Sequence, residues 1–228
     1  MSVFKPVACD CPACGSTIRI DACDSVNGVR RPDLRQEILD DRFQRCRCSA
    51  CRSEFRVQPA FTYLDVERGQ WLLVRPAGDL ADWQGFEAQA RTIHAEAFGA
   101  AADPAAQAIG ARLAVRVAFG WPAVREKLLC AVHGIDDVVL ELLKLALLRQ
   151  LGDLPLSDTV ELRLVGADTR QLRLAWLQAE DGALAEQLEV PRELLDEMAA
   201  ERADWQALHT ELAAAAYVDW QRFLVEPA

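Results

Sequence analysis

The stretches CDCPACG, residues 9–15, and CRCSACR, residues 46–52, decide how the N-terminal part of this sequence folds. Each contains the pattern Cys-x-Cys-x-x-Cys. Within it, the C-x-x-C pair has the spacing that lets two thiolates bind one metal ion at about 2.3 Å, and two such pairs complete a tetrahedron. The spacing therefore predicts a single metal site with four cysteine ligands: Cys11, Cys14, Cys48 and Cys51.

The residues around the first pair suit the tight turn that a metal-binding knuckle needs. Pro12 stiffens the turn, and Gly15 can adopt a positive φ after the second ligand. The second pair lacks both residues. We expect Zn²⁺, with iron as the alternative because four thiolates also suit it. A redox dithiol pair is disfavoured, since neither motif begins a helix that follows a strand.

Two cysteines remain outside this set of four ligands. Cys9 and Cys46 each precede the first ligand of a pair by two residues, which is roughly 6–7 Å along an extended chain. We therefore expect both in the outer shell of the site. A second metal bound by Cys9, Cys46 and Cys23 is the alternative, but it offers only three thiolates. The sequence leaves the role of Cys23 open.

The composition of the 228 residues is that of a globular protein, with 51% hydrophobic and 26% charged residues. The N-terminus has no apolar stretch typical of a secretory signal. The most apolar segment, VVLELLKLALLRQL, is interrupted by Glu141, Lys144 and Arg149, so we expect no membrane span. These features predict a cytoplasmic protein, where closely spaced cysteines are more often metal ligands than disulfides.

The charge distribution argues against strong nucleic-acid binding. The net charge is −10, and residues 1–75 carry 12 Lys and Arg against 10 Asp and Glu. Five arginines do lie around the second cysteine pair, where they are interspersed with acidic residues: Arg42, Arg45, Arg47, Arg52 and Arg56. Charge balance near the thiolates explains this cluster better than phosphate binding, although nucleic-acid or transcription-machinery binding stays the alternative.

The order of expected elements is mixed, which predicts an α+β fold. We expect a zinc ribbon with a small β-structure and one helix over residues 1–78, and an α+β domain over residues 79–228. Hydrophobic periodicity and turn signals predict strands at 16–21, 53–57, 61–66, 71–76, 112–119, 160–166 and 172–178, and helices at 31–43, 81–98, 122–129, 136–151 and 191–224.

The N-terminal part resembles the bacterial CpXC domain, which is named for two Cys-Pro-x-Cys motifs. The resemblance rests on CPACG, the following strand, RPDLRQEILDDRF, CSAC and the hairpin that begins at Phe61. It extends through VREKLLCAVHGIDDVVLELLKL to about residue 148. The sequence departs from the family pattern at Ser49, which replaces Pro, at Arg52, which replaces Gly, and at Leu64, where relatives often have His. The resemblance implies a fold more than a task.

A second candidate site is acidic. Glu126, Asp136 and Asp137 could bind a hard metal or support acid–base chemistry, and Glu141 and Lys144 share a helix face with Asp137. An ordinary polar stripe on a mostly buried helix has the same pattern. An enzyme that uses this cluster is therefore our third hypothesis.

The favoured function is a non-enzymatic, zinc-stabilised protein-interaction or scaffold protein. Four thiolates leave no coordination position for substrate. The partner is expected to be another protein or a second copy of this chain. The helix beginning at Asp136 is apolar on almost every side, so its surface must be buried against other elements or against a partner. The biological process does not follow from the residues.

Overall fold

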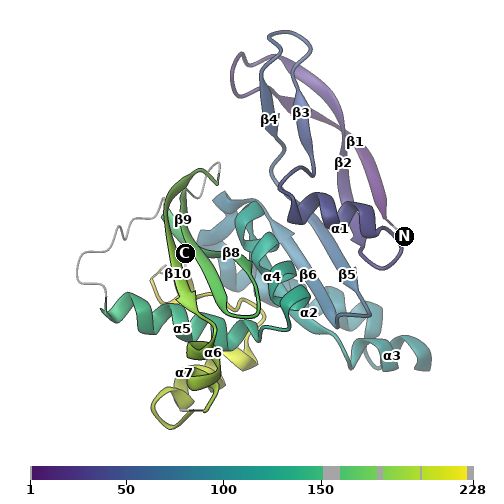
Figure 1. Cartoon of the computed structure of the whole chain (residues 1–228). Helices are drawn as coiled ribbons and strands as arrows, with labels where there is room; N and C mark the ends of the chain where they lie inside the picture. Colours follow the sequence, from purple (N-terminus) through teal and green to yellow (C-terminus); the bar gives the residue numbers. More distant parts are fainter. Residues whose placement is uncertain (1, 151–159, 179–181, 201, 225–228) are drawn as a thin grey trace.

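The computed structural model describes residues 2–150, 160–178, 182–200 and 202–224, and over these residues the fold is α+β (Figure 1). The elements in chain order are β1 (Val3–Asp10), β2 (Thr17–Asn27), α1 (Pro32–Leu39), β3 (Arg45–Arg47), β4 (Glu54–Arg56), β5 (Phe61–Asp65), β6 (Gln70–Arg75), the 3₁₀ helix η1 (Ala77–Asp82), α2 (Trp83–Phe98), α3 (Pro104–Gly110), β7 (Ala114–Phe119), α4 (Gly120–His133), α5 (Asp137–Gln150), β8 (Val160–Ala167), β9 (Gln171–Gln178), β10 (Leu184–Pro191), α6 (Glu193–Ala200), α7 (Arg202–Ala214) and the 3₁₀ helix η2 (Trp220–Phe223).

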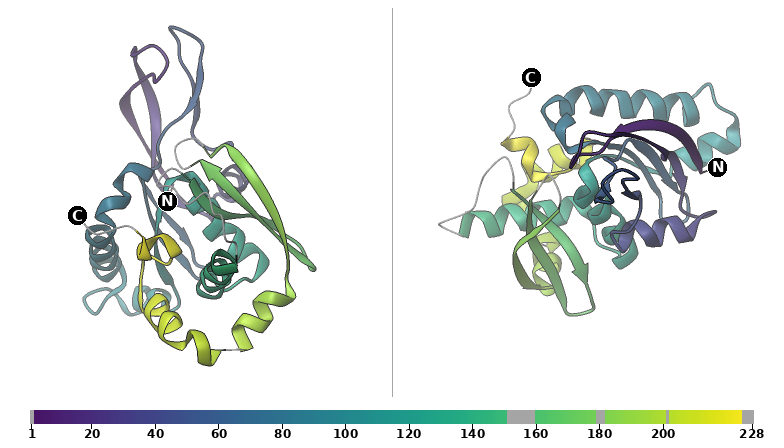
Figure 2. Two further views of the ribbon diagram at one scale, coloured as in Figure 1. Left: turned by 90° about the vertical axis from the view of Figure 1, so that its left-hand side faces the viewer. Right: turned by 90° about the horizontal axis from the view of Figure 1, so that it is seen from above.

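The central sheet has the strand order β1-β2-β5-β6-β7. Its hairpins β1–β2 and β5–β6 are antiparallel, whereas β2 pairs with β5 and β6 pairs with β7 in parallel. Alternating side chains of β5 and β6 point to opposite faces, and both faces are covered. Helices α1 and α4 lie on one side and α2 on the other, as the right-hand view of Figure 2 shows.

Strand β2 connects the metal-site region to the body of the protein. It is 11 residues long, but only Ser25–Asn27 pair with β5. Its first part pairs with β1 alone, so the β1–β2 hairpin projects from the sheet beside the short β3–β4 hairpin (Figure 1). We call residues 3–24 and 44–57, which make up these two projecting hairpins, the cysteine ribbon.

The C-terminal part forms a second core. Strands β8, β9 and β10 make an antiparallel sheet in the order β10-β9-β8, and α4, α5 and α6 pack against it. After α7, the chain returns to the central sheet, where the Val117 N–H donates to the Ala216 carbonyl at 2.9 Å. The C-terminal segment therefore joins the two cores.

Most predicted elements are confirmed. The helices α1, α2, α4 and α5 and the hairpins β5–β6 and β8–β9 lie where periodicity places them. Asp136 caps α5, since its carboxylate accepts hydrogen bonds from the N–H groups of Val138 and Val139. The predicted end of this helix at Gly152 lies outside the described residues.

The prediction of one long helix over residues 191–224 is confirmed only in part. Pro191 instead ends β10, α6 and α7 follow it, and beyond Ala214 the described chain has only the short 3₁₀ helix η2. The segment LAEQLEVP has a composition typical of a helix, but pairing with β9 makes it a strand, because tertiary pairing outweighs intrinsic propensity. The sequence also missed β1, and it missed α3, which begins at Pro104 in a stretch expected to be a connector.

The central sheet continues across the predicted boundary at residue 78, because β6 and β7 pair on either side of it. The division into two domains stays a prediction. Residues 138–144 of α5 are all buried, and α6, α7 and η2 of the same chain pack on this helix. Helix α5 therefore no longer argues for a second subunit.

None of the helices in the described part of the chain is both long enough and apolar enough to cross a membrane.

Candidate metal centre

The four predicted ligands lie together at the end of the cysteine ribbon. Their sulfur atoms all lie within 4.8 Å of one another. Cys11 Sγ is 3.7 Å from Cys51 Sγ, and Cys14 Sγ is 3.8 Å from Cys48 Sγ. A tetrahedral ion with metal–sulfur bonds of about 2.3 Å separates its ligands by about 3.8 Å. The cluster therefore has the dimensions needed to hold one metal ion.

The two knuckles have the same backbone hydrogen bonds. In the first, between β1 and β2, the Gly15 N–H donates to the Cys11 carbonyl at 2.8 Å, and the Cys11 N–H donates to the Ser16 carbonyl at 3.0 Å. In the second, between β3 and β4, Arg52 and Ser53 occupy the equivalent positions, and the corresponding distances are 3.0 and 2.9 Å. Two hairpin turns of one geometry thus present two cysteines each.

Both knuckles require a residue in the left-handed region. Gly15 has φ +70°, and Arg52 has φ +66°. Glycine adopts this conformation freely, whereas a residue with a Cβ atom is strained there by roughly 1–2 kcal/mol. The departure from the family pattern at residue 52 therefore places strain in the second knuckle.

Separate substitutions of Gly15 and Arg52 should change the free energy of unfolding in opposite directions. A Cβ atom at Gly15 would meet nothing within 4 Å, so Gly15→Ala should cost about 1 kcal/mol through the backbone alone. Arg52→Gly should relieve that strain, with a net gain below about 1 kcal/mol because glycine also loosens the unfolded chain.

Denaturant unfolding of the metal-loaded variants measures both effects. Gly78→Ala is the matched control, because Gly78 also has open space around it but no positive φ. Equal destabilisation by Gly15→Ala and Gly78→Ala would show that the backbone conformation is not the cause.

Two serines that sequence reasoning missed lower the pKa of the two exposed ligands, Cys14 and Cys51. The Ser53 hydroxyl, 3.2 Å from Cys51 Sγ, lowers the pKa of Cys51 to about 6. Ser16 stands at the equivalent position of the first knuckle, where its hydroxyl lowers the pKa of Cys14. Burial raises the pKa of Cys11 to about 11, although hydrogen bonds from the backbone N–H groups of the turn act to lower it. A serine two residues after each C-x-x-C pair is the signal that could have identified them.

The remaining N-terminal cysteines lie outside the four-sulfur cluster. Burial raises the pKa of Cys46, and the negative charge of Cys9 raises it further. Cys23 is buried with Phe43 under α1, and burial raises its pKa to about 12. The assignment of Cys9 and Cys46 to the outer shell stays a prediction.

The arginines near the second knuckle are largely held by their own chain. Arg42 pairs with Asp40 at 2.6 Å, and Arg45 and Arg56 both pair with Asp41. Arg56 also stacks on Trp121, with its guanidinium carbon 3.8 Å from the ring centroid. These contacts agree with charge balance rather than with a surface prepared for phosphate.

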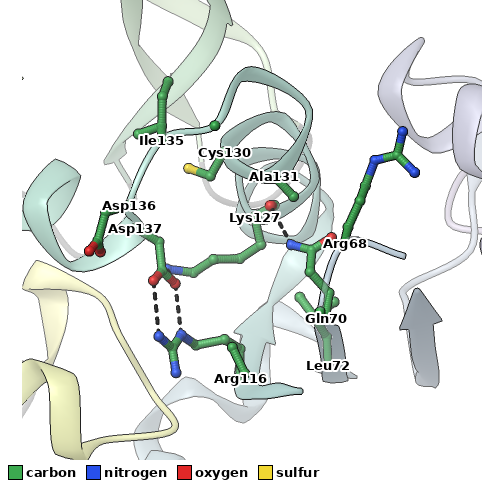
Figure 3. A pocket seen from close by; sticks show the side chains of 13 residues that line it. Arg68, Gln70, Leu72, Arg116, Lys127, Cys130, Ala131, Ile135, Asp136 and Asp137 are labelled. Atoms are coloured by element: carbon green, nitrogen blue, oxygen red, sulfur yellow. Dashed lines mark hydrogen bonds and ion pairs between the residues drawn. The ribbon is translucent and has the colours of Figure 1, made fainter. Parts of the chain in front are cut away.

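The predicted acidic residues do not form one site. Glu126 is fully buried and binds Lys144 and Arg163, whereas Asp137 binds Arg116 and Lys127 in a separate network (Figure 3). Asp136 caps α5. Among the residues that the structure describes, the four cysteines are the one group of three or more His, Cys, Asp or Glu side chains placed to share a metal ion.

Comparisons with known proteins identify the family. No curated protein and no solved structure matches the chain. The family model described as CpXC protein matches residues 9–144, which is more than half of the chain. The match begins at Cys9 and ends at Lys144 in α5, so it includes both knuckles and the strands β2, β5, β6 and β7 of the central sheet. The chain therefore belongs to the CpXC protein family.

Proposed function

We propose that this protein is a non-enzymatic, zinc-stabilised protein-interaction or scaffold protein of the bacterial cytoplasm. The observation that supports it best is the closed cysteine cluster: four sulfurs at tetrahedral spacing leave no coordination position for water or substrate. In such a site the metal stabilises a fold instead of performing chemistry. A reducing compartment keeps the thiols available for the metal.

Strand β1 supplies a surface for a protein partner. It is an edge of the central sheet, so one side of its backbone faces no neighbouring strand in the described fold. Val3, Phe4 and Val7 on this strand are each more than a third exposed, at 37%, 38% and 37%. Apolar side chains grouped on a free edge strand are typical of a contact surface, and such edges bind partners by strand addition.

A pull-down from the native host tests the proposal. The double variant Val3→Lys with Val7→Lys places two charges on β1 and should lose most of any specifically captured protein. The matched control is Ile109→Lys on α3, which also replaces an exposed apolar side chain, 41% exposed, but far from β1 in sequence. Equal capture by both variants would remove β1 from the proposal.

A gel shift across a salt series separates this function from nucleic-acid binding. Because phosphate contacts release counterions, nucleic-acid affinity falls steeply with salt. We expect no shift at physiological salt. A specific shift that Arg47→Ala weakens would favour the arginine-rich ribbon as a nucleic-acid surface and contradict the proposal.

A further inference from the structure

A pocket of about 590 Å³ lies where the cysteine ribbon meets the body of the protein. Its walls come from the end of β1 with the first knuckle, from β4 with the two residues after it, from the start of α4, and from Gly182 before β10. Gly182 lies against the start of α4, since a Cβ atom on it would be 3.6 Å from Pro122 Cγ. The pocket therefore lies between the ribbon and the β9–β10 hairpin.

Strand β4 lines this pocket along its edge. Five consecutive residues, 54–58, contribute to the wall. Successive side chains of a strand point to opposite faces, so a pocket that touches all of them lies beside the strand and not on one of its faces.

The edge of β4 that does not pair with β3 has free backbone groups. The Val57 N–H donates to the Gln44 carbonyl at 3.0 Å, and in an antiparallel pair the residues bonded to the partner alternate, so Phe55 also bonds to β3. The backbone groups of Glu54 and Arg56 point the other way, and they make no hydrogen bond with any residue that the structure describes. They can give up to four hydrogen bonds to an added strand.

The wall beside this edge is apolar and held in place. Phe55 and Val57 line the pocket from the β4 side and Trp121 from α4. The Trp121 indole N–H donates to the Val57 carbonyl at 2.8 Å, and the Arg56 guanidinium stacks on its ring. A wall fixed in this way loses little conformational freedom when an apolar side chain binds to it.

The charges that line the pocket favour a cation. Three carboxylates and two guanidiniums are present: Asp10, Asp41, Glu54, Arg45 and Arg56. Both arginines pair with Asp41, and the other two carboxylates form no ion pair within the described part of the chain. Arg47 lies opposite Glu54 in the β3–β4 ladder, but its Nε donates to the Arg52 carbonyl at 3.2 Å. The lining thus carries one excess negative charge.

We propose that this pocket binds an extended segment of a partner protein in which apolar residues are flanked by lysine or arginine. The segment would add to β4 as a further strand, with an apolar side chain on Phe55 and Trp121 and its cations near Asp10 and Glu54. The inference rests on the proposed protein-interaction function and names a second contact for the same partner. Two linked contacts reinforce each other, so weakening either one lowers capture.

The test titrates matched peptides, acetylated and amidated at their ends, into the ¹⁵N-labelled, metal-loaded protein and follows the amide signals of Glu54 and Arg56. The peptide KVLVK has both features, EVLVE reverses the charge, and KSSSK lacks the apolar side chains. We expect KVLVK to bind with a dissociation constant on the order of 0.5 mM, EVLVE about fivefold more weakly, and KSSSK without saturation.

Methylation of the peptide backbone tests strand addition. Only alternate N–H groups of an added strand face β4. KVLVK methylated at the leucine nitrogen and KVLVK methylated at both valine nitrogens should therefore differ, and one of the two should lose most of its binding. Equal affinity of the two methylated peptides would contradict strand addition.

Charge reversal in the protein supplies the matched variants. Glu54→Lys should weaken KVLVK about fivefold and favour EVLVE instead. Glu96→Lys, the same change at an exposed position of α2, should leave both affinities unchanged.

Three results would overturn the proposal: equal affinity of KVLVK and KSSSK, an unchanged charge preference in Glu54→Lys, or no shift of the two amide signals at about 5 mM KVLVK. Shifts of the same signals on raising the protein concentration without peptide would identify a second copy as the occupant and would overturn it as well. The titration and the pull-down have separate readouts, so failure of this site is distinguishable from failure of the proposed function.

Discussion

Removal of the metal is expected to unfold the cysteine ribbon and to leave the rest of the central sheet folded. In the ribbon, the only buried residues are Cys11, Cys23 and Cys48, so cysteine side chains replace an apolar core there. Structural zinc binds zinc-finger peptides with an apparent free energy of about 10–16 kcal/mol. Because the site exists only in the folded state, this binding free energy stabilises the fold. Without the metal, no bond joins the first knuckle to the second.

The body of the protein has its own core, which predicts where unfolding stops. Strands β5 and β6 pair with each other and with β7, and α1, α2 and α4 cover them. Hydrogen exchange with and without a strong chelator measures the effect. Protection should disappear across residues 3–24 and 44–57 and persist in β5, β6 and β7. Unchanged protection in the ribbon after confirmed metal loss would contradict the prediction.

Cysteine variants supply the controls, and mass spectrometry supplies the metal content. Cys11→Ser and Cys48→Ser should lose both the metal and the ribbon's protection. Cys9→Ser and Cys46→Ser change a cysteine in the same hairpins but outside the four-sulfur cluster, so both should retain one metal per chain. Two metals per chain, or metal loss from Cys9→Ser, would move these residues into the coordination shell. The same spectra identify the metal as zinc or iron.

The metal cluster could be predicted because its information is local. The C-x-x-C spacing determines which sulfurs meet within each knuckle, and a tetrahedral ion needs two knuckles. The supporting detail was harder to predict. Arg52 takes the left-handed conformation without being glycine, since the turn imposes it, and Ser16 and Ser53 act through short-range geometry that only their repeated position reveals.

Most pairs of the charged interior could not be predicted, because the partners are distant in the sequence. Helical spacing groups Asp137, Glu141 and Lys144 on one face. In the structure, Glu141 and Lys144 do pair, at 2.9 Å, but Lys144 also pairs with Glu126, and Asp137 pairs with Arg116 across 21 residues. Periodicity describes one element at a time and contains no information about which strand or helix packs against it. The same limit explains the break in the predicted C-terminal helix, where contacts with β7 and Glu141 outweigh helix propensity.

Replacing Arg163 is expected to cause a large loss of stability in the C-terminal core. This residue on β8 is 1% exposed. It pairs with Glu126 at 3.2 Å, with Glu161 at 2.5 Å and with Asp219, and its Nη2 donates to Gln221 Oε1 at 3.1 Å. Two of these partners belong to the C-terminal segment, so Arg163 ties that segment to the core.

Arg163→Met keeps the apolar stem and removes the charge. Three buried carboxylates would then lose a counterion, which typically costs 3–5 kcal/mol, on the order of half of a domain's stability. The control is Arg173→Met on the neighbouring strand β9, an exposed arginine that should change stability by less than about 0.5 kcal/mol. Urea unfolding at pH 8 compares the two variants, and a loss below about 1 kcal/mol for Arg163→Met would refute the account.

The pH dependence separates a lost counterion from a simple packing defect. Burial raises the pKa of Glu161 to about 7 even with Arg163 beside it, compared with 4.5 as the ordinary value. A raised folded-state pKa means that protonation favours the folded state. The contribution of Glu161 to the free energy of unfolding is therefore present at low pH and is lost as the pH rises from about 4.5 to about 7. Without Arg163 the carboxylates would bind protons still more readily. The destabilisation by Arg163→Met should therefore be smaller at pH 5 than at pH 8, whereas a cavity would cost the same at both.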